Sequence, residues 1–210
     1  MPEYRQMCFS LTLIAWLFVA AGTAGAGEPR PFLADTVSVH RHVHRVWWTV
    51  SEPVRPWEFV VIHHSATMRG SVESIHRDHR SRRDRNGQPW LGIGYHFVIG
   101  NGSGMPDGHI SPTFRWKQQL HGAHSGSLLH NGHGIGICLI GNFEEHPPTA
   151  AQRASVVSLL RRLTRQYRIP KEKVIGHRHI RATACPGRLF PLKEIVKEAM
   201  SGNVAFIPTR

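Results

Sequence analysis

Acidic residues are scarce in this sequence of 210 residues. Asp and Glu number 14 against 26 Lys and Arg, so the formal net charge is +12 with the 16 histidines counted as neutral. Such an excess suits a polyanionic partner: nucleic acid, an anionic membrane or a cell-wall polymer. It is equally typical of a protein whose arginines only solvate its surface. Charge alone therefore does not choose the partner.

Long apolar runs are also lacking. The most apolar stretch, Cys8 to Ala21, has 14 residues, which is short for a membrane span of about 20 residues but typical of a secretory signal. Arg5 precedes it, and small residues follow at 24–26. We predict a signal peptide over 1–26, a mature start near Gly27 and no stable membrane span after cleavage. The alternative is an uncleaved anchor.

Export narrows the choice of partner. A secreted or periplasmic protein is poorly placed to serve intracellular DNA, so we expect no nucleic acid as partner. A basic protein outside the cytoplasm is better suited to an anionic polymer of the cell envelope.

Cysteine is rare, with three residues in all. Cys8 leaves with the signal peptide, and Cys138 and Cys185 remain. A disulfide between them is compatible with an oxidising compartment. Cys138 lies in "GIGICLIG", which is typical of a buried strand where a free cysteine acts as a small hydrophobe. Cys185 is a metal ligand, half of a disulfide or a core residue, and its spacing alone does not decide.

The remaining sequence divides into three parts. Residues 27–57 form a basic lead-in, in which His40, His42 and His44 alternate and would share one face of any strand. That face is either a solvated basic edge or a metal site that has no acidic or cysteine partner. Residues 58–200 form one domain, and 201–210 a tail.

Within the domain, strands are expected at 58–66, 93–100, 133–143 and 173–177. Helices are expected from Ser71, from the capping box at Thr149 to Tyr167, and from Pro191. Strands that alternate with helices indicate a single α/β domain.

A zinc peptidase of the common kind is disfavoured, because no H-E-x-x-H segment is present. Three other residues have the chemistry of a zinc site. His63 and His177 each end a predicted strand, and Cys185 follows eight positions after His177. Imidazole nitrogen and thiolate suit zinc, and three protein ligands leave a fourth position open for catalysis.

Five motifs in order carry a resemblance: "VVIHHSA", "GYHFVIG", "GAHSG…N", "GIGICLIGN" and "GHRHIRATACPG". Together they resemble the zinc-dependent N-acetylmuramoyl-L-alanine amidases, the family that includes phage T7-type lysozyme-amidases and peptidoglycan recognition proteins. The resemblance implies a mixed central β-sheet flanked by helices, with a zinc cleft on one face. It implies peptidoglycan as ligand and hydrolysis of the amide between N-acetylmuramic acid and L-alanine.

The resemblance also implies roles for single residues. His63, His177 and Cys185 match the zinc ligands, and Tyr95 and Thr183 match catalytic positions beside the metal. His124 and Asn131 match the substrate-contact stretch, and we add His64 to these contacts. The donor of a proton to the leaving amine stays open among His64, His124 and Tyr95.

Three departures from the family stand out. His179 replaces the acidic residue of "GHRD", the segment between His124 and Asn131 is longer than in the phage enzymes, and Cys138 stands where cytoplasmic relatives carry Glu. Binding-only relatives commonly lack the cysteine ligand, which is present here. We therefore predict a monomeric zinc amidase, with a non-catalytic peptidoglycan-binding module as the alternative.

Overall fold

The computed structural model describes residues 50, 52–84 and 86–201. The predicted signal peptide, the lead-in up to Thr49 and the tail beyond Ser201 lie outside these residues. Among the described helices, none has the length and apolar character needed to cross a bilayer.

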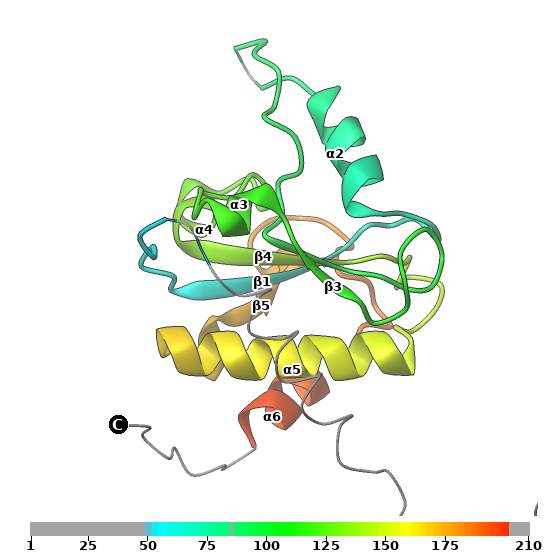
Figure 1. Ribbon diagram of the computed structural model, residues 1–210. Helices are drawn as coiled ribbons and strands as arrows, with labels where there is room; N and C mark the ends of the chain where they lie inside the picture. The colour runs from blue at the N-terminus through cyan, green and yellow to red at the C-terminus, as the bar shows by residue number, and fades with distance from the viewer. Residues whose placement is uncertain (1–49, 51, 85, 202–210) are drawn as a thin grey trace, which may run out of the picture.

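Five strands form one mixed sheet in the order β3-β2-β4-β1-β5 (Figure 1). β1 pairs in parallel with β4 and β5, and β2 is parallel to β4 but antiparallel to β3. The strands are β1 (Phe59–His64), β2 (Phe97–Ile99), β3 (Ile110–Pro112), β4 (Gly134–Leu139) and β5 (Val174–Gly176). The predicted mixed sheet of a single α/β domain is confirmed.

Helices lie on both sides of this sheet (Figure 1). The long helix α5 crosses one face with α6 outside it, whereas α3 and α4 lie on the opposite side and α2 projects away from the body. The helices are α2 (Val72–Arg80), α3 (Phe114–Lys117), α4 (Leu128–His133), α5 (Ala150–Tyr167) and α6 (Leu192–Met200). Two 3-10 turns, η1 (Lys171–Lys173) and η2 (His177–His179), flank β5.

Local sequence explains where the main helices begin and end. Ser71 and Thr149 each form a capping box, in which the side chain of the cap accepts from a backbone N–H three residues on. α5 ends at Tyr167 because Arg168 takes a left-handed conformation, and Pro170 prevents the helix from continuing.

All four predicted strands are shorter in the structure, and two of them differ most from the prediction. The segment 93–100 is a strand only from Phe97, because Gly94 pairs with a loop instead, accepting a hydrogen bond from the N–H of Ala123. The segment 133–143 is a strand only over Gly134–Leu139, since His133 is the last residue of α4 and the strand stops four residues before Phe143.

Alternation along β1 separates two environments. Val60 and Ile62 face the main core between the sheet and α5, together with Ile135 and Ile137 of β4. His63 lies on the other face, opposite Cys138 of β4. Both faces of β1 are buried, which is why its sequence is a nearly continuous apolar run.

Candidate metal centre

Three nitrogen and sulfur donors meet on the face of the sheet away from α5. One ligand atom each of His63, His177 and Cys185 lies within 4.8 Å of the other two. β5 pairs with β1 through Gly176 and Ile62, so His177, the next residue of the chain, emerges beside His63. Their ring centroids are 4.6 Å apart. The fold thus brings together the three residues that the sequence named as zinc ligands.

The spacing of these donors fits zinc. His63 Nδ1 lies 3.6 Å from Cys185 Sγ. Tetrahedral zinc, with Zn–S near 2.3 Å and Zn–N near 2.0–2.1 Å, would place the two atoms about 3.5 Å apart. Both residues are buried, with exposed fractions of 1% and 8%. The donor types and their separation therefore suit a zinc ion with one open position.

Backbone contacts hold the loop that carries Cys185. The carbonyl of Cys185 accepts from the N–H of Arg178 at 2.9 Å, and the guanidinium of Arg178 donates to Ala184 O at 2.8 Å. The chain then turns at Gly187 with φ +106°, where an added Cβ would stand 2.3 Å from the backbone of Phe143. Only glycine fits that position without displacing its neighbour.

The protonation of Cys185 depends on two opposed effects. Burial raises the pKa of its thiol to about 11, while the backbone N–H of His64, 3.4 Å from Sγ, favours the thiolate. Because the thiolate is the form that ligates, metal binding must release the thiol proton.

Tyr95 lies directly beside the donors. Its ring centroid is 5.0 Å from that of His63 and 5.5 Å from that of His79. Burial raises the pKa of Tyr95 well above its usual value of 10.0, so the phenol is neutral and able to donate a hydrogen bond. The thiol of Cys138 interacts with this hydroxyl.

Thr183 is exposed at the edge of the same site. Its Oγ1 accepts a hydrogen bond from the N–H of Cys185 at 3.3 Å. A hydroxyl that accepts in this way still has its own proton to donate. Thr183 therefore supports the ligand loop and offers a donor at its rim.

The three expected substrate contacts lie in different places. His64 is on the opposite face of β1 from His63, where its Nδ1 accepts from the N–H of Phe143 at 3.2 Å. His124 is 8% exposed, and its ring lies between His63 and the carbonyl of Gly134. Asn131 bonds to the backbone of His124. The structure brings His124 against His63 and Asn131 against the backbone of His124, whereas the ring of His64 lies away from the candidate donors.

Two further residues of the site, Ser125 and Arg115, have no recognisable signal in the sequence. The carbonyl oxygen of Ser125 is 3.1 Å from His177 Nε2. This contact involves only the backbone of Ser125, so the identity of the side chain does not predict it. Arg115, which is 2% exposed, donates from Nε to Ile93 O and from Nη1 to His121 O, both at 2.6 Å. It thereby ties together the segments that lead to Tyr95 and His124. The partners of Arg115 are backbone carbonyls, which every residue has. No acidic residue in the sequence therefore indicates that this arginine is buried.

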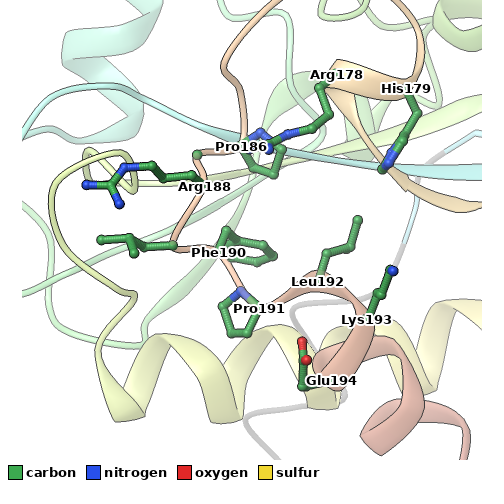
Figure 2. Close-up of a pocket in the computed structure, with 11 residues that line it drawn as sticks. Arg178, His179, Pro186, Arg188, Phe190, Pro191, Leu192, Lys193 and Glu194 are labelled. Carbon is green, nitrogen blue, oxygen red and sulfur yellow. The ribbon is translucent and has the colours of Figure 1, made fainter.

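A pocket of about 390 Å³ lies on the outer side of the ligand loop. Figure 2 shows Arg178 and His179 on one side of it and residues of α6, including Lys193 and Glu194, on the other. None of the three metal donors lines this pocket. It borders the metal centre through Pro186 but is separate from it.

Sequence comparison identifies the family. The profile of the N-acetylmuramoyl-L-alanine amidases matches residues 53–188. The chain belongs to this family. Its match spans β1 through the loop that carries Cys185, and therefore includes every residue of the candidate metal centre.

Relatives of the chain carry two kinds of name. Peptidoglycan recognition protein 1 of Bos indicus is 30% identical over 186 residues, which are 84% of this chain and 89% of that protein. The N-acetylmuramoyl-L-alanine amidase of Homo sapiens is 29% identical over 150 residues, 65% of this chain and 24% of that one. The solved N-acetylmuramoyl-L-alanine amidase LysC of Clostridium intestinale is similar with a TM-score of 0.56 and 31% identity, over 71% of this chain and 89% of that one. Membership alone therefore leaves both cleavage and recognition of peptidoglycan open.

Proposed function

We propose that this chain is a zinc-dependent N-acetylmuramoyl-L-alanine amidase, which hydrolyses the amide between N-acetylmuramic acid and the L-alanine of peptidoglycan stem peptides. The complete donor set of His63, His177 and Cys185 carries the proposal. A binding module has no need of three convergent donors with a fourth position free. The alternative is a non-catalytic peptidoglycan-binding module, and the product analysis described below distinguishes the two.

The division of chemical roles follows from the side chains. Zinc held by the three donors supplies Lewis-acid polarisation of a carbonyl and makes water a competent nucleophile near neutral pH. Tyr95, a neutral phenol beside His63, is suited to stabilise negative charge that develops on the carbonyl oxygen. Thr183 offers a second hydroxyl at the rim. Both act as hydrogen-bond donors and neither as a ligand.

Partner and location follow the same proposal. A formal net charge of +12 suits the anionic cell envelope, and we propose a monomeric protein that acts there on peptidoglycan, secreted or in the periplasm. N-terminal sequencing of the exported protein should find a start near Gly27. A start at Met1 or Pro2 would favour an uncleaved anchor.

Product analysis tests the activity itself. Purified sacculi are incubated with the zinc-loaded protein, and the soluble fraction is examined by mass spectrometry. Free stem peptides that begin with L-alanine are expected, together with glycan that has lost them, and a chelator should abolish their release. Protein that pellets with sacculi but releases no peptide would establish the binding module instead.

A further inference from the structure

The ring of His124 connects a metal-binding histidine to the backbone. Its Nδ1 lies 3.0 Å from His63 Nε2, and its Nε2 lies 3.2 Å from the carbonyl oxygen of Gly134. A carbonyl oxygen only accepts, so Nε2 of His124 carries a proton and Nδ1 presents a lone pair. His63 must then donate from Nε2, which leaves its Nδ1, the atom facing Cys185, free to ligate.

The second histidine is oriented by the next residue of the same loop. His177 Nε2 lies 3.1 Å from the carbonyl oxygen of Ser125. By the same reasoning Nε2 of His177 carries the proton, and Nδ1 is left unprotonated for the metal. Two consecutive residues, His124 and Ser125, therefore set the tautomers of both ligand histidines.

Asn131 holds this pair of residues in place. Its Oδ1 accepts from the N–H of His124 at 2.9 Å and from the N–H of Ser125 at 3.0 Å, and it lies 3.0 Å from Ser125 Oγ. Its own carbonyl accepts from the N–H of Gly122 at 2.8 Å. Within the described part of the chain, the hydrogen bonds of this side chain all run through Oδ1, so a carboxylate in its place would accept the same bonds.

Two glycines make room for the imidazole of His124. A Cβ on Gly136 of β4 would stand 2.5 Å from the ring, and a Cβ on Gly122 would stand 2.3 Å from it. Neither glycine has a positive φ, so space rather than backbone conformation requires them. The strand is thus shaped to accept this ring at the metal centre.

We propose that His124, Ser125 and Asn131, together the histidine clamp, are positioning residues that orient His63 and His177 for the metal. The inference rests on the zinc site of the proposed function and assigns His124 and Asn131 a role other than substrate contact. Both ring nitrogens of His124 and the amide oxygen of Asn131 already have partners within the protein. Loss of partners that orient metal-binding histidines typically costs roughly 10–100-fold in metal affinity.

The test measures zinc affinity by competition with a chelating dye. His124→Leu removes the acceptor and should weaken zinc binding roughly 10–100-fold. His124→Asn places Oδ1 where Nδ1 stands, so it keeps the acceptor for His63 and should recover most of the affinity. Cobalt(II) in place of zinc gives a second readout, because its visible spectrum should change in the Leu variant and return toward wild type in the Asn variant.

Two further pairs separate positioning from other roles. Asn131→Asp keeps the acceptor oxygens and should keep zinc affinity, whereas Asn131→Leu should lower it. Gly136→Ala should lower affinity as His124→Leu does, because the new methyl group displaces the ring. The control is Val156→Ala in α5, a core residue remote from the donors, which should lose stability in thermal unfolding without losing zinc affinity.

The outcomes are distinguishable. Wild-type protein that binds no zinc would overturn the proposed function together with the clamp. Wild-type protein that binds one zinc while His124→Leu binds it equally well would overturn the clamp alone. Loss of affinity in both Leu variants with recovery in His124→Asn and Asn131→Asp would establish it.

Discussion

His63 and Cys138 lie directly opposite each other on the adjacent parallel strands β1 and β4. Both side chains are on the face of the sheet away from α5, and both are almost fully buried, at 1% and 0% exposure. Even so, the donor that completes the site with His63 is Cys185, 122 positions further along the chain. Burial raises the pKa of the Cys138 thiol well above its usual value, so this cysteine stays protonated beside Tyr95. The two cysteines therefore have separate roles.

The first prediction compares these cysteines. Cys185→Ala should lose its zinc, because only two of the three convergent donors remain. Cys138→Ala should keep one zinc per chain, because its sulfur is not among the donors that converge in the described part of the chain. Metal analysis of both purified proteins checks this. A full equivalent of zinc in Cys185→Ala would show that Cys185 is not a ligand.

The second prediction concerns the turn after Cys185. Gly187→Ala should destabilise the protein by roughly 2 kcal/mol or more, because its positive φ and the backbone of Phe143 both oppose a methyl group. Gly132→Ala, in helix α4 where nothing lies within 4 Å of the new Cβ, is the matched control. It should be neutral or stabilise by up to about 1 kcal/mol. Urea unfolding of both variants measures the difference.

The third prediction is the pH dependence of stability that His79 contributes. Burial lowers the pKa of His79 from 6.5 to about 4, and its Nδ1 accepts from the N–H of Gly94. Between these two values the unfolded chain binds the proton more tightly than the folded one. Stability is therefore lost as pH falls from about 6.5 to about 4, and this residue adds no pH dependence above that range.

His79→Asn separates this contribution from that of other buried histidines. Asn keeps an acceptor for Gly94 but does not titrate, so the loss of stability between pH 7 and pH 4.5 should be smaller by roughly 2 kcal/mol than in wild type. Urea unfolding at several pH values measures both curves. The remaining histidines titrate alike in the two proteins and cancel, so parallel curves would refute the assignment.

Much of this architecture was accessible from the sequence. The strands that lead to His63 and His177, the N-cap at Ser71, the capping box at Thr149 and the α/β class all depend on patterns of neighbouring residues, although β1 continues to His64 and β5 already ends at Gly176. The short elements β3, α3 and α4 were missed, because three to six residues carry too little periodicity to recognise. The buried run of β1 likewise gave no alternation to separate His63 from His64, and only the family resemblance chose between them.

The interior of the site was less accessible. The resemblance implies substrate contact for His124 and Asn131, whereas the proposed clamp depends on the direction in which these loop side chains point, which no local pattern shows. Their bonds to His63 and to the loop backbone exist only once β1, β4 and the loop are packed together. The contact from Ser125 is made by a carbonyl, a group that every residue has. Tertiary packing decides these roles.

The last prediction separates metal binding from catalysis at Tyr95. Tyr95→Phe keeps the ring against His63 and deletes only the hydroxyl, so zinc content and affinity for sacculi should stay near wild type. If the phenol stabilises charge that develops only in the transition state, kcat should fall roughly 10²–10³-fold.

The matched control is Tyr167→Phe at the end of α5. The hydroxyl of Tyr167 accepts from Gln166 away from the site, so this variant should keep full turnover. Release of stem peptide from sacculi, measured beside zinc content, checks both. Full turnover in Tyr95→Phe would make this tyrosine a packing residue only, whereas loss of zinc would show that the ring of His63 needs the hydroxyl to hold its place.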